Sequence, residues 1–550
     1  MGPRCPVQAI GAAPEIIPFL GVTFQRLTLY IFQMSSNSRH TKSVAGSRRS
    51  FLKTGAALGA AAALPSFTTR AADEQKKWPD NSLLQGSWTP VHEEVAADNL
   101  KIIGKLPVDL EGMFVRNGPN PQFPPKQNYH LFEGDGMIHG VRLRDGKASY
   151  RNRWVRTAAW QEERKANKTL YPSFLDPIDL TFFGKQLLAG KSPFANRANT
   201  ALIWHHGKLL ALWEGGAPHE IKVPGLETVG EYNFGGALKH PCTAHPKVDP
   251  KTGEMMFHAY AVAPFQPNLV YSVADRKGKI IHTTEIKLPR PVMMHDLAIT
   301  RKSTLFLDAP FVLDSAGLMR GNPLYKWEPK FGARIGVLPR HAAGDKVRWF
   351  EIKPCFVFHV FNAFENGAEV NLYGCRYPSF PDVISFNPKA LNDKGAEIAR
   401  ESRPVAYRWQ LNLKTGKTTE GALDDFDCEF PRIQDRLAGT KTRYGYGLSD
   451  GNAQLGFNSL VKFDFAKERN ERHNLGKDRE SGEGVFVPRK DGKNEDDGYL
   501  ISFVYDHAER RSEMAIIDCR DFKKAVVARV LIPQRVPNGF HGMWLDDDVL

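Results

Sequence analysis

The sequence predicts an all-β protein, and its length and texture favour a β-propeller. From about Trp78 onward, short apolar stretches alternate with turns, and long amphipathic helices are nearly absent. Many short strands at regular spacing are typical of sandwiches, barrels and propellers. About 480 residues share this one texture without a linker, which is too many for a single sandwich or small barrel. A propeller of six to eight blades therefore fits the chain best.

Individual strands are indicated by apolar runs that are bounded by turn residues. Residues 201–204 and 209–213 are predicted to form a hairpin around a turn at 205–208. A turn at 249–254 leads into a strand over 255–262. Further strands are expected at 297–300, 304–307, 370–373, 498–505 and 525–532, and one short helix at 388–400.

The net charge of +13 is concentrated at the N-terminus. Residues 1–72 contain eight Lys or Arg residues and one acidic residue, so the body of the chain is only mildly basic. No basic stripe interleaved with aromatic residues is present. We therefore expect no nucleic-acid partner.

The N-terminal region also carries an export motif. Ser47-Arg48-Arg49-Ser50-Phe51-Leu52-Lys53 precedes a weakly apolar stretch at 54–64, as in twin-arginine signals. That stretch is too short to span a bilayer. We expect a misassigned start or an extension at 1–33, a signal peptide at 34–72 that starts at Met34, and a single domain at 73–550. Such a protein would be exported, for example to the periplasm.

Four histidines lie in apolar segments flanked by turns, namely His245, His295, His359 and His541. Their separations of 50, 64 and 182 residues correspond to whole supersecondary units, unlike a zinc motif on one helix. In a propeller, four blades could each direct one histidine at a single ion on the axis. Imidazoles suit iron, zinc, copper or nickel. Zinc usually closes at four ligands, so four histidines with open positions favour iron.

Three glutamates are embedded among apolar or glycine residues, namely Glu214, Glu429 and Glu483. A buried carboxylate without a partner is costly. An imidazole that binds a metal normally donates its other N–H to an acceptor, often a carboxylate. These three residues are therefore candidates to orient the histidines.

Several motifs then occur in the order found in one known family. They are 111–121 (EGMFVRNGPNP), 134–139 (GDGMIH), 212–215 (LWEG), 245–250 (HPKVDP), 294–296 (MHD), 358–359 (FH) with 362–365 (NAFE), 482–489 (GEGVFVPR) and 539–542 (GFHG). With these motifs the chain resembles the carotenoid cleavage oxygenases, a family that includes carotenoid, apocarotenoid and stilbene dioxygenases and a retinoid isomerase. It departs from the family pattern at Phe364, where Tyr is common, and at Glu133, where Asp is frequent.

The resemblance implies a seven-bladed propeller with a cap of loops and short helices over a substrate tunnel. It implies non-haem Fe(II) held by His245, His295, His359 and His541. Glu214, Glu429 and Glu483 match the carboxylates that orient three of the histidines. Thr200 matches a residue whose methyl group crowds one open iron position in some members.

The implied reaction is the cleavage of a conjugated C=C bond by O2, giving two carbonyl products. Trp213 stands beside Glu214, where stilbene-cleaving members carry Lys, and this favours a carotenoid or apocarotenoid substrate. Cleavage of a stilbene or another phenylpropanoid alkene is the alternative. A non-catalytic binding propeller would need broken ligands, and a zinc hydrolase would need an evident base beside the open site.

An apolar insertion at 310–327 is flanked by basic residues. Such a segment suits peripheral contact with a membrane that supplies a lipid-like substrate. It suits equally well a cap that packs on the tunnel.

Overall fold

The computed structural model describes residues 78–550, except 127, 177–178, 261–266, 315–316, 318–322, 381–402, 452–455 and 525. Residues 75–550 form one compact unit. The expected helix at 388–400, the extension at 1–33 and the signal at 34–72 lie outside the described residues. The boundaries between these segments stay a prediction.

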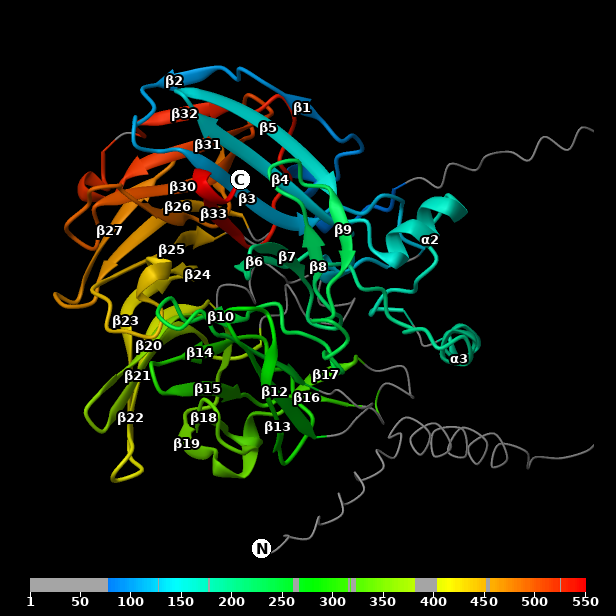
Figure 1. The fold of residues 1–550 in the computed structure, drawn as a ribbon, viewed down its shortest axis with the longest axis vertical. Helices are drawn as coiled ribbons and strands as arrows, with labels where there is room; N and C mark the ends of the chain where they lie inside the picture. Colours follow the sequence, from blue (N-terminus) through cyan, green and yellow to red (C-terminus); the bar gives the residue numbers. More distant parts are fainter. Residues whose placement is uncertain are drawn as a thin grey trace, which may run out of the picture. The chain divides into compact units, whose positions relative to one another are not determined.

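Antiparallel sheets follow one another along the chain and surround a common centre (Figure 1). Blade 1 consists of β33 (Gly542–Asp546), β3 (Gly112–Pro119), β4 (Gly136–Arg144), β5 (Lys147–Trp154) and β1 (Ala96–Ala97). Blade 2 consists of β6 (Ala201–His205), β7 (Lys208–Leu212), β8 (His219–Ile221) and β9 (Thr228–Glu231). Blade 3 consists of β10 (Lys247–Val248), β11 (Met255–Tyr260), β12 (Asn268–Ala274) and β13 (Ile280–Lys287). Blade 4 consists of β14 (Leu297–Ile299), β15 (Ser303–Asp308), β18 (Ala333–Pro339) and β19 (Arg348–Ile352).

The remaining blades come from the second half of the chain. Blade 5 consists of β20 (Phe356–Asn366), β21 (Glu369–Tyr377), β22 (Val405–Asn412) and β23 (Thr418–Asp427). Blade 6 consists of β24 (Glu429–Arg432), β25 (Tyr444–Gly451), β26 (Phe457–Asp464) and β27 (Arg469–Asn474). Blade 7 consists of β28 (Arg479–Ser481) and β29 (Val485–Pro488), which both pair with β30 (Gly498–Asp506), and then β31 (Arg511–Asp518), β32 (Ala528–Leu531) and β2 (Ile102–Gly104). One pairing, Phe457 with Ser481, joins blades 6 and 7 into a single sheet.

The ring is closed by strands from both ends of the described chain. C-terminal β33 pairs with β3, from Gly112 opposite Asp546 to Arg116 opposite Gly542. N-terminal β2 pairs with β32 in the same way at blade 7. The innermost strand of blade 1, β33, contacts both β6 of blade 2 and β29 of blade 7, so blade 1 packs between its two neighbours. The predicted all-β propeller is confirmed. It has seven blades, as the family resemblance implied.

The core of the molecule lies between the blades. Each of the seven junctions between neighbouring blades contains its own apolar cluster, for example Phe306 with Tyr271 between blades 4 and 3. The predicted hairpin at 201–213 is β6 and β7, joined at His206-Gly207, where both residues have positive φ as a tight hairpin turn requires. The predicted strand at 255–262 is described as far as Tyr260.

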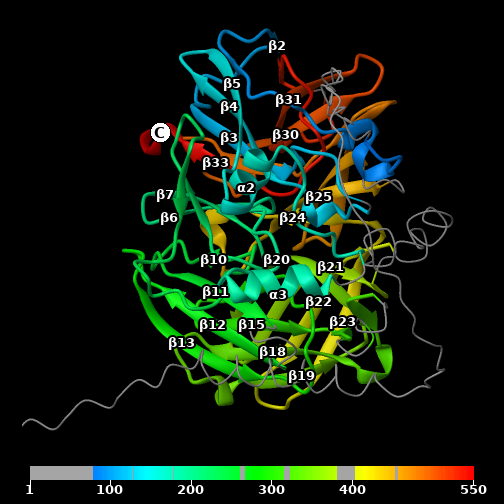
Figure 2. The same cartoon turned by 90° about the vertical axis from the view of Figure 1, so that its right-hand side faces the viewer.

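A cap of loops and short helices covers one side of the propeller. Helices α2 (Ala158–Ala166) and α3 (Leu180–Leu188) lie on the same side in both views (Figures 1 and 2).

Along the described chain as a whole, short 3-10 turns occur at Ser82–Leu84, Gly86–Trp88, Leu131–Glu133, Pro329–Phe331, Gly344–Lys346, Asp435–Leu437, Cys519–Asp521 and Asp547–Val549. An eighth apolar cluster, here named the cap cluster, contains Leu83, Leu84, Trp88, Tyr129, Leu131, Leu175, Met293, Ala309, Phe311, Phe356, Phe358, Tyr377, Phe380 and Phe540.

The insertion at 310–327 contributes to this cap. Its ends are the hairpin strands β16 (Phe311–Leu313) and β17 (Tyr325–Trp327). Phe311 is buried and stacks on Phe380 with ring centroids 3.7 Å apart. For Phe311 this favours the cap over membrane contact, whereas 315–316 and 318–322 lie outside the described residues. Among the described residues, no helix has the length and apolar character needed to cross a membrane.

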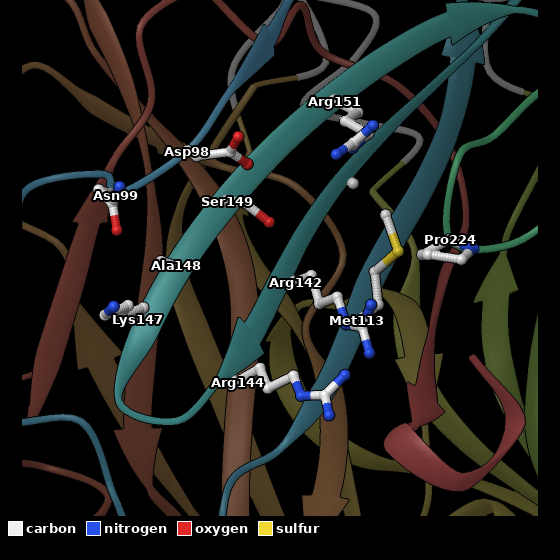
Figure 3. Close-up of a pocket in the computed structure, with 11 residues that line it drawn as sticks. Asp98, Asn99, Met113, Arg142, Arg144, Lys147, Ala148, Ser149, Arg151 and Pro224 are labelled. Atoms are coloured by element: carbon white, nitrogen blue, oxygen red, sulfur yellow. The ribbon is translucent and has the colours of Figure 1, made fainter.

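Blade 1 carries a basic pocket of about 280 Å³ on one face (Figure 3). Alternate residues of β4 and β5 point into it, because side chains in a strand alternate between the two faces. The register places Arg142 opposite Ser149 and Arg144 opposite Lys147. Two cations therefore occupy directly opposite positions of the sheet, and Arg144 also lies 3.6 Å from the carboxylate of Asp145.

Candidate metal centre

Each of the seven blades presents one predicted site residue at the same end of its innermost strand. Thr200 precedes β6, His245 precedes β10, His295 precedes β14, His359 lies in β20, Glu429 begins β24, Glu483 precedes β29 and His541 precedes β33. Glu214, the eighth predicted residue, follows β7 of blade 2. The propeller thus brings together residues that are up to 341 positions apart, between Thr200 and His541.

The four histidines meet through their Nε2 atoms. The Nε2 atoms of His245 and His295 are 2.9 Å apart, and those of His295 and His359 are 3.3 Å apart. His541 Nε2 lies 3.1 Å from His359 Nε2, and the ring centroids of His541 and His245 are 4.6 Å apart. The structure therefore brings all four imidazole side chains together.

In three of the histidines the other ring nitrogen, Nδ1, contacts the carboxylate of a glutamate. Glu214 contacts Nδ1 of His295. Glu429 lies 2.6 Å from Nδ1 of His359, and Glu483 lies 2.9 Å from Nδ1 of His541. Glu429 and Glu483 accept hydrogen bonds from Nδ1–H, so the Nε2 lone pairs of His359 and His541 are free to point inward. Among the described residues, His245 forms no ion pair with a carboxylate.

Local chain geometry explains how these residues are aimed. β20 has a bulge between Val357 and Val360, and this irregularity directs His359 inward. Gly542 is needed because β33 lies close to β3, and a Cβ there would be 2.8 Å from the carbonyl oxygen of Val115.

Hydrogen bonds to the main chain link the ligand loops around the axis. Thr243 Oγ1 donates to the carbonyl oxygen of His295 at 3.2 Å. Asp296 accepts the N–H of Val360 at 3.0 Å, next to His359. The N–H of His541 donates to the carbonyl oxygen of Thr200 at 3.1 Å. The positions of the four histidines are therefore interdependent.

Burial keeps two of the imidazoles, those of His245 and His541, neutral. Burial, together with the neighbouring histidines, lowers the pKa of His245 well below its usual range. Burial lowers the pKa of His541 to about 4. His359 is the exception, because burial lowers its pKa but the adjacent Glu429 outweighs that effect and raises it. Burial acts to raise the pKa of Glu483, but Arg432 and His541 hold it below its usual range.

Thr200 is fixed by its neighbour Asn199. The Thr200 hydroxyl donates to Asn199 Oδ1 at 2.9 Å. The Asn199 amide in turn donates to the carbonyl oxygens of Phe132 at 3.0 Å and Gly134 at 2.6 Å. A cap loop is thus tied to the ring of site residues.

Sequence reasoning missed two aromatic residues at the centre. Phe430 stacks on His359 with centroids 5.4 Å apart and lies 5.2 Å from the His541 ring. Tyr260, in β11, donates a hydrogen bond from its hydroxyl to Glu214. Phe430 directly follows Glu429 and could have been noticed, whereas nothing in the local sequence singles out Tyr260.

The donor set fits a borderline divalent ion. Two nitrogens that bind one ion at right angles, each about 2.1 Å away, are about 3.0 Å apart, close to the spacings of 2.9 to 3.3 Å between neighbouring Nε2 atoms. Among the described residues, His245, His295 and His359 form the group whose donor atoms all lie within 4.8 Å of one another. Neutral imidazoles with acceptors on Nδ1 are the protonation state that metal binding requires.

The fold and the centre define a β-propeller with a buried cluster of four histidines on its axis. The family model described as retinal pigment epithelial membrane protein matches residues 88–546. The carotenoid 9,10(9',10')-cleavage dioxygenase of Crocus sativus is 39% identical over 500 residues, which cover 85% of this chain and 89% of that protein. The chain belongs to the carotenoid cleavage oxygenase family and is an oxygenase of that family.

Relatives with other substrates in their names are also similar. An isoeugenol monooxygenase of Pseudomonas nitroreducens is 33% identical over 480 residues, which cover 84% of this chain and 97% of that protein. The crystal structure of a Pseudomonas brassicacearum lignostilbene dioxygenase superposes with a TM-score of 0.77 at 29% identity, covering 86% of this chain and 99% of that one. Family membership alone therefore leaves the substrate open.

A twin-arginine signal sequence matches residues 47–65. The prediction of export by the twin-arginine route is confirmed.

Proposed function

We propose that the protein is a non-haem Fe(II) dioxygenase that cleaves a conjugated C=C bond of a carotenoid or apocarotenoid with O2. His245, His295, His359 and His541 would hold the iron, and Glu214, Glu429 and Glu483 would orient three of them. The products are two carbonyl compounds. The alkene supplies the four electrons that reduce O2, so no nicotinamide or flavin is needed.

The observation that carries this proposal is the contact between the histidines and the cap cluster. Phe358 and Phe540 of that cluster directly precede His359 and His541 in the sequence. The Phe358 ring also packs edge-on against His295 at a centroid distance of 5.1 Å. A substrate that reaches the centre from this side meets hydrocarbon side chains. We infer that the cap cluster lines the substrate tunnel.

The protein's own residues have defined tasks in this proposal. When bound, ferrous iron supplies a site at which O2 is activated. The three glutamates hold the Nδ1 protons and keep the Nε2 lone pairs directed at the axis. The apolar cap excludes water from the reacting alkene. Thr200 would crowd one open position, leaving the other for O2.

Trp213 supports a hydrocarbon substrate over a phenol. It is 7% exposed, and its ring lies over Gly215, beside Glu214. An indole ring at this position has no ammonium group with which to bind a phenolate. Cleavage of a stilbene or another phenylpropanoid alkene is the second candidate, favoured by the similarity to the isoeugenol and lignostilbene enzymes.

The test is an isotope experiment on the full chain loaded with Fe(II). The protein would be incubated under 18O2 with β-carotene, an apocarotenal, isoeugenol and a hydroxystilbene, and the products identified by mass spectrometry. We expect 18O-labelled carbonyl pairs from a polyene and none from a matched His295→Ala sample. Labelled benzaldehydes with no polyene products would move the assignment to the second candidate. No product from any substrate at full iron occupancy would contradict the proposal.

A further inference from the structure

Strand β11 presents two polar side chains to the neighbourhood of His295. His258 and Tyr260 are two positions apart and therefore lie on the same face of the strand. His258 is fully buried and Tyr260 is partly buried. Neither is one of the predicted site residues. Each, however, forms a hydrogen bond with a site residue or with the residue directly before one.

His258 supports the main chain next to His295. Its Nε2 atom lies 2.8 Å from the carbonyl oxygen of Met294, the residue before His295. Burial lowers the pKa of His258 to about 4, so the ring is neutral and can donate N–H to that carbonyl. The position of the His295 backbone is thus held independently of its side chain.

Tyr260 supports the carboxylate that contacts the His295 ring. Its hydroxyl donates to Oε2 of Glu214, while Oε1 of the same carboxylate contacts Nδ1 of His295. Burial and the charge of Glu214 raise the pKa of Tyr260 well above its usual range, so the hydroxyl keeps its proton. The Glu214 carboxylate therefore accepts a hydrogen bond from the Tyr260 hydroxyl at one oxygen and contacts the His295 ring at the other.

The other two carboxylates each accept a main-chain N–H, and the Tyr377 hydroxyl also lies beside Glu429. Glu483 accepts the main-chain N–H of Gly542 at 2.8 Å, and Glu429 accepts the main-chain N–H of Phe430. Glu214 lies in a turn after β7 of blade 2. The side chain that donates a hydrogen bond to it, Tyr260, belongs to blade 3. The orientation of Glu214 therefore depends on one hydroxyl group to a greater extent than that of Glu429 or Glu483.

We propose that Tyr260 is a positioning residue for the metal centre: its hydroxyl fixes the rotamer of Glu214, and Glu214 fixes the ring of His295. The inference rests on the proposed iron site. Tyr260 also packs against the cap cluster, so the same side chain joins the apolar cap to the ligand set. It touches neither the ion nor the reacting atoms.

The test is Tyr260→Phe, which keeps the ring and removes only the hydroxyl group. Fe(II) affinity would be measured by competition with a chelator, and ligand geometry by the visible absorption spectrum of the Co(II)-loaded protein. Loss of a direct partner of a ligating histidine typically costs 10- to 100-fold in metal affinity. For a residue one step further out we expect a loss of about 3- to 10-fold and a changed Co(II) spectrum.

Tyr150→Phe is the matched control. Tyr150 is fully buried in the core between blades 1 and 7, and its hydroxyl lies 2.8 Å from His139 Nδ1 and not on a carboxylate of the centre. We expect this variant to lose stability to unfolding while Fe(II) affinity and the Co(II) spectrum stay within error of the parent protein. A purely structural role of Tyr260 would give that same pattern and would overturn the inference.

A second comparison uses Glu214→Gln. If Tyr260 acts through Glu214, adding Tyr260→Phe to Glu214→Gln should weaken Fe(II) binding by less than twofold beyond the single variant. An additive loss would show that Tyr260 acts by another route. Failure of the parent protein to bind Fe(II) would overturn the proposed function as well, whereas normal binding by Tyr260→Phe overturns the inference alone.

Discussion

The Nδ1 atom of His359 lies 2.6 Å from Oε2 of Glu429, and the same oxygen accepts the main-chain N–H of Phe430. The carboxylate is thereby fixed against its own backbone and in turn fixes the imidazole. Both residues come from innermost strands of neighbouring blades, β20 and β24, which contact each other. The geometry of the centre therefore depends on how adjacent blades pack.

Glu429→Gln should weaken Fe(II) binding about 10- to 100-fold, because a neutral amide is a poorer acceptor for the His359 Nδ1 proton. Chelator competition would measure the change. Glu365→Gln is the control, because Glu365 accepts hydrogen bonds from Thr300 and Ser303 in blade 4 instead of from a histidine of the centre. Equal affinities for the two variants would mean that Glu429 has no part in metal binding.

Asn199→Ala should destabilise the protein by about 2–4 kcal/mol, since it removes a donor from the buried carbonyl oxygen of Gly134 and from the partly buried one of Phe132. The Thr200 hydroxyl loses its acceptor in the same variant. The free energy of unfolding in urea would show the loss. Asn268→Ala, which removes an exposed hydrogen bond to Glu285, should change it by less than about 0.5 kcal/mol. A smaller effect at Asn199 than at Asn268 would contradict the described linkage.

Lys147→Glu should stabilise the protein by about 0.2–1 kcal/mol, because it replaces the like-charged cross-strand pair of Arg144 and Lys147 with an opposite-charged one (Figure 3). Unfolding experiments at low and high salt would check this, and the gain should shrink at 1 M salt because exposed charges are screened. Lys277→Glu, in a turn outside the pocket, should give a smaller gain. No gain at low salt would mean that the two cations do not repel each other.

The stability of the protein should depend on pH through His219 of β8. Burial lowers the pKa of His219 to about 4, whereas an unfolded chain has a histidine pKa of about 6.5. Above pH 6.5 both states carry a neutral ring. Between pH 6.5 and 4 the unfolded state takes up a proton that the folded state does not, so the fold loses stability as the pH falls.

His219→Gln removes that difference between the two states. The variant should therefore lose less free energy of unfolding than the parent protein between pH 7 and pH 5, whatever its absolute stability. Urea titrations at the two pH values would compare the slopes. Identical slopes would show that His219 titrates normally in the fold.

Much of the architecture could be predicted because the propeller repeats a local signal. The hairpin at 201–213 has apolar strands and a turn with glycine, and the structure contains it as β6 and β7. The four histidines could be grouped because each lies in an apolar segment beside a turn. The family motifs then gave their order and the number of blades.

Other features depend on contacts between distant segments. Tyr260 meets Glu214 because blades 2 and 3 are adjacent, and neither residue's local sequence records that contact. The break between β28 and β29, which places Glu483, follows from pairing with two parts of β30. The buried position of Phe311 was also undecided, because an apolar segment suits a cap and a membrane surface equally well.

X-ray absorption at the iron edge tests the central claim most directly, since it counts the imidazole ligands of the Fe(II)-loaded chain. We predict one iron per chain, with scattering that fits four imidazoles at about 2.1 Å. The variants His245→Ala and His541→Ala should each lose one imidazole or the metal itself. Iron with two or fewer imidazoles, or a spectrum unchanged in both variants, would contradict the four-histidine centre.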